Sequence, residues 1–192
     1  MVRRGLAAPA PCGRPPKVFG KRRSAGPIRE ESGVDIAFRR LSDIPLDDIT
    51  AHMSDPRVAA HMPLLSGDWS DRQSAELVAA KEETWRRDGL GHWAFVVDGV
   101  YAGWGGFQRE GEEWDFGLVL RPDRFGLGPR IARACLNAAA RHPRIPFVTF
   151  LLPPSRNHIA ALARLGAREV DGVEYGGAAF RKFRLDTPET RA

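Results

Sequence analysis

The chain has 192 residues, of which 43% are hydrophobic and 28% are charged. This length and composition fit one globular domain and exclude a wholly disordered chain, a collagen-like chain and a disulfide scaffold. The two cysteines, Cys12 and Cys135, stand in neither a C-x-x-C nor a Cys/His metal spacing, which fits a reducing cytoplasm. No apolar run is long enough to span a membrane, and no secretory signal pattern follows the basic N-terminus.

The net charge of +5 is concentrated at one end of the chain. Residues 1–33 hold eight basic and two acidic side chains, a net +6, so residues 34–192 carry −1. The first segment is rich in Pro, Gly, Ala and Arg and has no apolar period, which predicts a disordered basic tail. A nucleic-acid-binding arm and an upstream start-codon assignment are alternatives for this segment. We expect the folded domain to span 34–187, with a short C-terminal tail over 188–192.

The first half of the domain is predicted to begin with a strand over 34–41 and a helix over 43–53, capped by Ser42 or Asp43. A loop with a short helical piece follows over 55–69. Ser70 then caps a long helix through residue 87, which Gly89 ends. Apolar runs over 93–97 and 100–107 are separated by Asp98-Gly99, a strong hairpin signal. With a third strand over 112–120, these runs predict an antiparallel meander.

The second half is predicted to begin with a glycine-containing turn and a helix that ends near residue 141. A strongly apolar strand over 146–152 is expected in the centre of the sheet. A helix over 156–165, closed by Gly166, and two strands over 168–173 and 178–185 complete the chain. The expected fold is therefore α/β (α+β), with a single mixed, mostly antiparallel sheet of about six to seven strands flanked by helices.

The stretch from Val119 to Arg130 passes from a strand through Gly126 and Gly128 into a helix. Exposed amides at a helix start favour an anion, and glycines allow a phosphate to approach the backbone. No acidic residue lies between 124 and 168, whereas eight arginines do: 124, 130, 133, 141, 144, 156, 164 and 168. A tight turn with Pro129 at the first helical position and a solvated basic face are the alternatives. The nucleotide P-loop and dinucleotide patterns are absent.

These residues resemble the phosphate loop of the GCN5-related N-acetyltransferases (GNAT), P-x-x-x-G-x-G-x-[AG], which reads here from Pro122 to Arg130. The resemblance covers about residues 34–186. It includes Phe38-Arg39-Arg40-Leu41, the segment Asp55 to Pro63 before a Ser-initiated helix, Asp115-Phe116-Gly117 and Leu162-Ala163-Arg164-Leu165-Gly166-Ala167. The segment from Asp55 and Asp115-Phe116-Gly117 are similar to the ribosomal-protein N-terminal (Rim-type) branch, and the last stretch is similar to the family's L-x-x-L-G-F/A signature after the last helix.

The resemblance implies an acyl-coenzyme A-dependent N-acetyltransferase that binds acetyl-CoA. The implied binding residues are Leu118, Val119, Leu120, Arg124, Phe125, Gly126, Leu127, Gly128, Pro129, Arg130 and Asn157. Phe125 and Arg130 depart from the family pattern, and Pro129 has no amide to donate. The amides of Leu127, Gly128 and Arg130 remain.

The acceptor ammonium must lose a proton before it attacks, and a carboxylate can act as the base. Glu113 and Asp115 share one face of the predicted strand. Asp115 matches the family's Glu position and is the first candidate, Glu113 the second. A solvated acid at the strand start is the alternative for Asp115. The usual Tyr position holds Leu162, and neither Tyr101 nor Tyr175 fits the motif.

His158 falls at a polar position of the Rim-type branch and is the candidate acid, although a capping role for the nearby Ser155 competes with it. Trp104, flanked by glycines that suit a ligand or a close backbone approach, is the candidate floor of a substrate cleft. His61 and Met62 are the other substrate-binding candidates. The histidines lack metal-ligand spacing, so no metal is expected.

Three functions follow, in order. The first is transfer of an acetyl group from acetyl-CoA to a primary amine of a small molecule or a peptide or protein N-terminus, in the cytoplasm. The second is a CoA-binding module with weak or lost catalysis. The third is nucleic-acid binding through the basic tail. The expected partners are acetyl-CoA and an amine acceptor, without a membrane and with nucleic acid disfavoured; a homodimer is left open.

Overall fold

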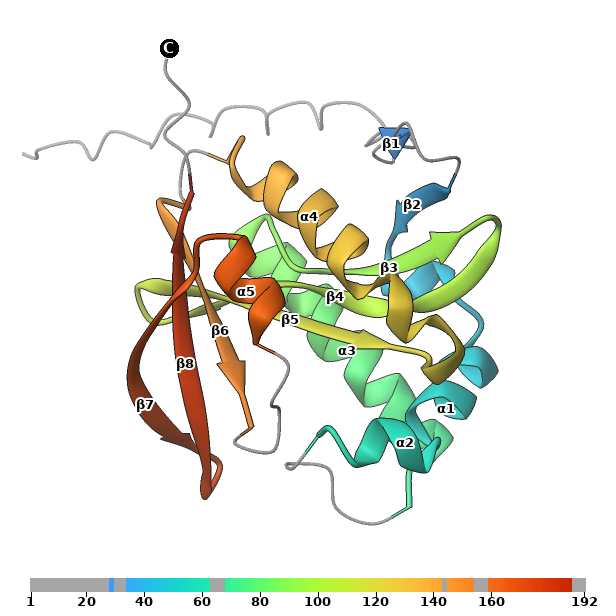
Figure 1. Cartoon of the computed structure of the whole chain (residues 1–192). Coiled ribbons are helices and arrows are strands. Elements are labelled where there is room, and N and C mark those ends of the chain that lie inside the picture. The colour runs from blue at the N-terminus through green and yellow to red at the C-terminus, as the bar shows by residue number, and fades with distance from the viewer. Residues whose placement is uncertain (1–27, 30–33, 63–67, 143–144, 154–158, 188–192) are drawn as a thin grey trace, which may run out of the picture.

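A single mixed sheet of eight strands organises the protein, in the order β1-β2-β3-β4-β5-β6-β8-β7 (Figure 1). The computed structural model describes residues 28–29, 34–62, 68–142, 145–153 and 159–187. The strands are β1 Ile28–Arg29, β2 Asp35–Arg39, β3 His92–Val97, β4 Val100–Glu110, β5 Glu113–Leu120, β6 Phe147–Leu152, β7 Arg168–Tyr175 and β8 Ala178–Asp186. All neighbours pair antiparallel except β5 and β6, which pair parallel. The predicted fold class is confirmed, and the two-residue β1 is the strand that sequence reasoning did not anticipate.

Helices cover both faces of this sheet. They are α1 Leu46–Met53, α2 Pro56–Ala59, α3 Asp71–Asp88, α4 Gly128–Ala139 and α5 Ala160–Arg164, with 3-10 turns η1 Leu41–Asp43 and η2 Pro122–Leu127. In Figure 1, α4 and α5 lie on one face, and α1, α2 and α3 lie on the other. We call these the α4 face and the α3 face.

Local signals in the sequence explain most of the element ends. Ser70 accepts a hydrogen bond from the Gln73 amide at the start of α3, and Gly89, with φ 73°, ends that helix. Asp98 and Gly99, with φ 51° and 81°, turn β3 into β4 as the hairpin signal predicts. The predicted start of the helix over 43–53 is wrong, because Leu41–Asp43 forms a 3-10 turn and Pro45, not Ser42 or Asp43, is the N-cap of α1.

Three other predictions differ from the structure in smaller ways. β6 is internal, between β5 and β8, but stands toward the β7 edge rather than in the centre of the sheet. The predicted helix over 156–165 is described only from residue 159, and its helical residues are those of α5. Of the predicted tail, only Ile28–Arg29 lies among the described residues, and it pairs with Asp35 and Ile36 of β2.

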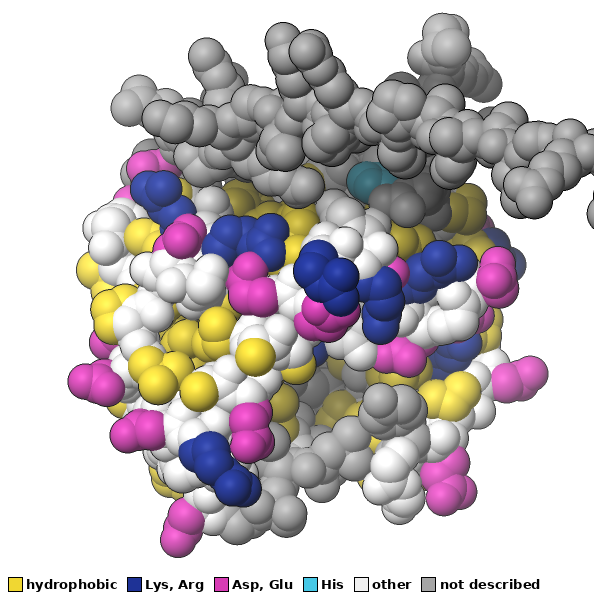
Figure 2. Space-filling model, turned by 180° about the vertical axis from the view of Figure 1, so that it is seen from behind, with side chains coloured by type: hydrophobic (Ala, Val, Ile, Leu, Met, Phe, Trp, Pro, Cys, Tyr) yellow, Lys and Arg dark blue, Asp and Glu magenta, His cyan; other side chains and the backbone are white. Residues whose placement is uncertain are grey.

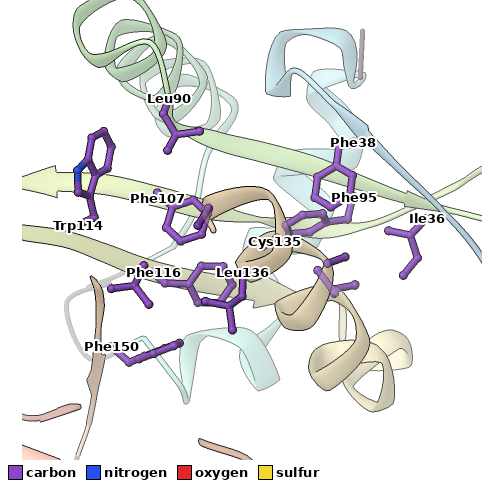
Figure 3. Packing of buried hydrophobic residues seen from close by; sticks show 14 of the residues in the cluster. Ile36, Phe38, Leu90, Phe95, Phe107, Trp114, Phe116, Cys135, Leu136 and Phe150 are labelled. Carbon is purple, nitrogen blue, oxygen red and sulfur yellow. The ribbon is translucent and has the colours of Figure 1, made fainter. Parts of the chain in front are cut away.

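The main core lies between the sheet and α4. Figure 3 shows Cys135 and Leu136 of α4 packed against the aromatic rings of Phe95, Phe107 and Phe116. The Phe107 and Phe116 ring centroids are 5.3 Å apart. A second, smaller core joins α1 and α3 to the opposite face. Burial raises the pKa of the Cys135 thiol, so this cysteine is a structural residue.

Candidate active site

The parallel strands β5 and β6 meet at one registered pair, Asp115 with Thr149. Beyond this pair the two strands part, as Figure 1 shows for β5 and β6. Successive β5 residues point to opposite faces. Leu118 and Leu120 therefore join the core on the α4 face, whereas Asp115, Gly117 and Val119 point to the α3 face.

The predicted phosphate loop is the 3-10 turn η2 followed by the first turn of α4. α4 begins at Gly128 with Pro129 in its first turn, and no acidic residue lies there. A Cβ added to Gly126 would meet nothing within 4 Å, and one on Gly128 would lie 3.8 Å from Leu120 Cδ1. The loop surface is thus open above Gly126, whereas a side chain at Gly128 would make ordinary van der Waals contacts. The Gly128 amide already donates to the Phe125 carbonyl, so it is not the free donor that the sequence suggested.

The arginines predicted to surround this loop fall into two groups. Arg124 forms an ion pair with Asp123 at 3.3 Å, and Arg168 forms one with Asp186 at 3.4 Å. Within the described part of the chain, no ion pair involves the other described members of the set, Arg130, Arg133, Arg141 and Arg164. Arg144 and Arg156 lie outside the described residues. The positive charge at the start of α4 therefore comes mainly from Arg130 and Arg133.

The opposite side of the molecule has a mixed surface. The exposed flank of α3 carries ion pairs between Arg72 and Glu76 and between Arg86 and Glu83. Viewed from behind, basic and acidic side chains lie among one another rather than in a patch of one sign (Figure 2). A uniform attraction for polyanions is not expected of this face.

Asp115 is the most perturbed carboxyl group near the point where β5 and β6 part. Burial raises its pKa from an ordinary value of 3.8 to about 6, although a hydrogen bond from Thr149 Oγ1, at 3.3 Å, opposes this rise. Glu110 raises the pKa further by like-charge repulsion. A carboxyl group with this pKa is ionised at neutral pH and still has an appreciable affinity for a proton.

Glu113 lies on the same face as Asp115, as strand alternation predicts. Its carboxylate accepts a hydrogen bond from Lys182 Nζ of β8 at 2.5 Å and forms an ion pair with it. A carboxylate held in an ion pair is a weaker candidate for proton transfer than Asp115.

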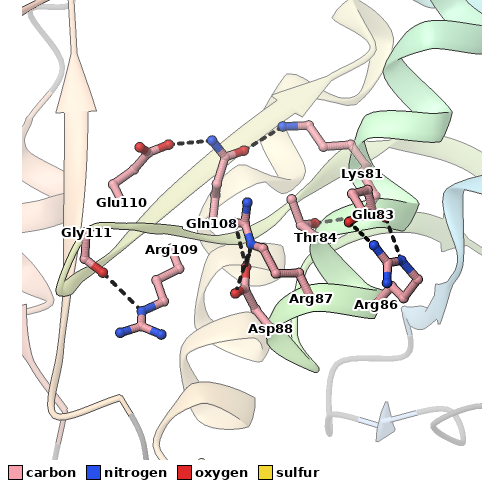
Figure 4. A network of polar contacts seen from close by, with 10 residues as sticks. All are labelled: Lys81, Glu83, Thr84, Arg86, Arg87, Asp88, Gln108, Arg109, Glu110 and Gly111. Carbon is pink, nitrogen blue, oxygen red and sulfur yellow. Dashed lines mark hydrogen bonds and ion pairs between the residues drawn. The ribbon is translucent and has the colours of Figure 1, made fainter.

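A polar chain runs beside Asp115, from α3 across β4. Lys81 Nζ donates to Gln108 Oε1 at 2.8 Å, and Gln108 Nε2 donates to Glu110 Oε1 at 2.5 Å (Figure 4). Gln108 is also the register partner of Asp115. Desolvation lowers the pKa of Lys81. The acid on β5 therefore stands next to a partly buried network that joins a cation to a second carboxylate.

Trp104 is buried, with 5% of its surface exposed, and packs in the smaller core. Its indole Nε1 donates to Met53 Sδ at 3.3 Å, and its ring lies 5.5 Å from Lys81 Nζ. A Cβ on Gly103 or Gly105 would come within 2.4 or 2.5 Å of a carbonyl oxygen on β5. The glycines beside Trp104 thus permit a close backbone approach, which was one of their two expected roles.

His61 and Met62 follow α2 at the end of a described segment. The His61 and Phe125 ring centroids are 5.9 Å apart, so this candidate contacts the phosphate loop. Met62 packs against the smaller core with Val119. The two predicted substrate residues thus lie next to the predicted CoA-binding residues.

The candidates Asn157 and His158, with Ser155, lie outside the described residues. Of the tyrosines, Tyr101 is buried, and its hydroxyl lies 3.0 Å from His52 Nδ1. The described residues contain no group of three or more His, Cys, Asp or Glu side chains placed to hold a metal ion. None of the described helices has the length and apolarity needed to cross a membrane.

His92 is a residue that sequence reasoning missed. It opens β3, and its side chain is buried on the α3 face, 5.5 Å from the Trp104 ring between centroids. In the sequence, His92 was examined only as a metal ligand. Its position opposite glycines on two neighbouring strands was not predicted. The sequence signal for this position is the Gly105-Gly106 pair together with Gly117. These glycines are informative only when the register of the strands is known.

Residues 35–168 match the family model described as an acetyltransferase (GNAT) domain. No curated protein matches the chain in sequence.

Solved structures share the fold. An acetyltransferase from Agrobacterium tumefaciens str. C58 has a TM-score of 0.67 and 18% identity, covering 90% of this chain and 99% of that one. Mycobacterium smegmatis RimJ, in complex with CoA-disulfide, has a TM-score of 0.64 and 18% identity, covering 87% and 88%. RimL, a ribosomal L7/L12 alpha-N-protein acetyltransferase in complex with coenzyme A, has a TM-score of 0.64 and 15% identity, covering 85% and 99%.

Proposed function

The chain belongs to the GNAT acetyltransferase family, and we propose that it moves the acetyl group of acetyl-CoA to a primary amine of a small molecule or of a peptide or protein N-terminus. Membership makes it an acyl-CoA-dependent acetyltransferase; the acceptor class and the roles of individual residues are the proposal. The cysteine usage favours the cytoplasm as the place of this reaction.

In this proposal the diphosphate of acetyl-CoA binds at the start of α4. Gly126 leaves open space there, a Cβ at Gly128 would make only ordinary contacts, and no acid in the first turn of α4 repels an anion. The remaining donors are the backbone amide and the guanidinium of Arg130, because Leu127 is the last residue of the 3-10 turn. Pro129 supplies a fixed helix start in place of an amide.

The thioester end of acetyl-CoA extends along the edge of β5 that β6 leaves free. This edge runs from Leu120, next to the phosphate loop, back to Asp115. Its backbone groups have no registered partner on β6, so they are available to the amides of an extended ligand arm. The arm then ends beside Asp115.

Asp115 acts as the base in this proposal. It takes a proton from the acceptor ammonium, and the neutral amine forms a bond to the acetyl carbon as the carbon–sulfur bond breaks. The nitrogen loses a second proton as the amide forms, and the leaving thiolate takes up one proton, so that the products are the amide and coenzyme A. The carboxylates of Glu110, Glu113 and Asp115 on one face attract a cationic acceptor. RimL, which shares this fold, acts on a protein N-terminus, which supports including that class of acceptor.

The observation that carries the proposal is the position of Asp115, with its pKa raised to about 6, at the last pair between β5 and β6. Incubation with acetyl-CoA and a panel of small amines and peptides, read by thiol release and mass spectrometry, tests it. We expect the product to be about 42 Da heavier than the amine, which corresponds to the addition of one acetyl group. Binding of acetyl-CoA without release of thiol across the panel would instead support a CoA-binding module.

A further inference from the structure

His92 reaches across the sheet toward the edge where we place the reaction. It pairs in register with Gly106 of β4, which pairs with Gly117 of β5. Paired residues of antiparallel strands point to the same face, so the imidazole lies over two positions that have no side chain. Its Nε2 is 3.7 Å from the point that a Cβ on Gly117 would occupy.

The surroundings of His92 keep the imidazole neutral. The side chain is 4% exposed, and burial together with the nearby charge of Lys81 lowers its pKa well below the usual value. Its Nδ1 has no hydrogen-bond partner among the residues that the structure describes. In the Nδ1–H tautomer, Nε2 is free to accept a hydrogen bond on the side of β5.

His92 and Asp115 border the same short length of β5. Asp115 is two residues from Gly117 and points to the same face, about 7 Å along the strand. Gln108 and Lys81 lie beside them. Lys81 Nζ donates to Gln108 Oε1, Gln108 is the register partner of Asp115, and burial together with the charge of Lys81 lowers the pKa of His92. A neutral imidazole and an ionised carboxylate thus lie on the same face of the sheet, on β3 and on β5.

We propose that His92 is a further active-site residue, whose Nε2 accepts a hydrogen bond from the acceptor amine. This inference rests on the proposed function. Asp115 removes the proton from the ammonium, while His92 holds a remaining N–H and directs the nitrogen lone pair at the acetyl carbon. As the carbon–nitrogen bond forms, the nitrogen becomes positive, and the hydrogen bond to the imidazole strengthens. The contribution is therefore larger in the transition state than in the bound substrate.

To test this role, His92 is replaced by a residue without a ring, and imidazole is then added to the solution as a substitute base. We expect His92→Gly to lower kcat by roughly 10²-fold, the lower end for a positioned proton acceptor. Added imidazole should restore part of the activity. Pyrazole has nearly the same size but is far less basic, so it should not. Equal rescue by both azoles would show that the ring only fills space and would overturn the proposal.

His52 is the matched control, because it is equally buried, at 3% exposed, on the same side of the sheet. Its Nδ1 already lies 3.0 Å from the Tyr101 hydroxyl. His52→Gly should lose stability, but its folded fraction should keep its kcat and show no response to imidazole. An imidazole response as large as that of His92→Gly would contradict a specific role for His92.

A milder variant covers the case in which His92→Gly does not fold. His92→Gln keeps a polar group, and we expect it to lower kcat while the thermal shift produced by acetyl-CoA stays the same. Wild-type kcat in folded His92→Gln would overturn this inference alone. Absence of acetyl transfer by the wild-type protein would overturn the proposed function as well, so the two failures are distinguishable.

Discussion

The phosphate loop and the polar strip of the α3 face, which consists of Lys81, His92, Gln108 and Asp115, are built in opposite ways. The loop, Pro122 to Arg130, is a continuous stretch of chain that offers backbone groups, with open space above Gly126. The strip brings together side chains of α3, β3, β4 and β5, among them Lys81, Gln108 and Asp115. Burial lowers the pKa of Lys81 and raises that of Asp115. In the proposed function, cosubstrate binding thus depends on backbone geometry, whereas the chemistry depends on desolvated side chains.

The largest expected effect comes from the strip. Asp115→Asn should lower kcat by 10²-fold or more, roughly the value of one positioned base, while the dissociation constant for acetyl-CoA stays similar. In the wild-type protein, kcat should fall below about pH 6 as Asp115 takes up a proton. Steady-state rates from pH 5 to 8 measure both effects. Glu113→Gln is the control, and a larger loss in that variant would exchange the roles of the two acids.

The same substitution should make the protein more stable. The raised pKa means that the folded state binds a proton between pH 3.8 and about 6, where the unfolded chain has already lost it. The free energy of unfolding therefore falls as the pH rises through this range. Above pH 6 the protein bears the full destabilisation caused by the buried, ionised carboxylate. Asp115→Asn removes this cost, which is at most about 3 kcal/mol at 1.36 kcal/mol per pKa unit.

Urea unfolding at pH 4 and pH 8 checks this second prediction. The difference between Asp115→Asn and the wild-type protein should appear at pH 8 and largely vanish at pH 4. An equal difference at both values would show that the Thr149 hydrogen bond, and not the buried charge, decides the stability.

Substitution of the loop should affect binding rather than chemistry. Gly128→Glu places a carboxylate where the diphosphate is expected, and we expect about a tenfold or greater loss of affinity for acetyl-CoA, since like charges at a helix start repel. The variant should fold, because a Cβ at this position makes only ordinary contacts. Gly128→Gln separates the effect of charge from that of size. Gly126→Ala, with open space around its Cβ, is the neutral control in thermal-shift titrations.

The smallest effect is expected from the basic segment before β1. Deletion of residues 1–27 leaves the paired Ile28–Arg29 in place, so the melting temperature, kcat and affinity for acetyl-CoA should stay the same. Differential scanning fluorimetry and steady-state kinetics measure this. A drop of more than a few degrees would show that the segment packs on the domain.

The contrast between loop and strip also explains what the sequence could predict. The hairpin at Asp98-Gly99, the caps of α3 and the start of α4 depend on neighbouring residues, and each was predicted to within a few positions. The candidate Asp115 was found because strand alternation and a family motif both point to it. Its raised pKa was not predicted, because burial is a property of the assembled sheet.

His92 shows where such reasoning ends. Its partners Gly106 and Gly117 lie 14 and 25 residues further along the chain, and only the register places them in one row. The hydrogen bond from the Gly128 amide to the Phe125 carbonyl could not be predicted either, because it depends on the backbone conformation of the 3-10 turn. The start of α1 was placed wrongly for a related reason, since η1 takes up residues that look like a helix cap.

The parting of β5 and β6 has a consequence for the protein in storage and in the cell. A strand edge without a registered partner is a template for a foreign strand, and folded proteins ordinarily protect such edges. Here the protection would come from the bound cosubstrate, which lies where a neighbouring strand would be. The cosubstrate then acts as a solubility factor as well as a reactant. Aggregation of the purified protein should accordingly slow as the coenzyme A concentration rises, independently of any acetyl transfer.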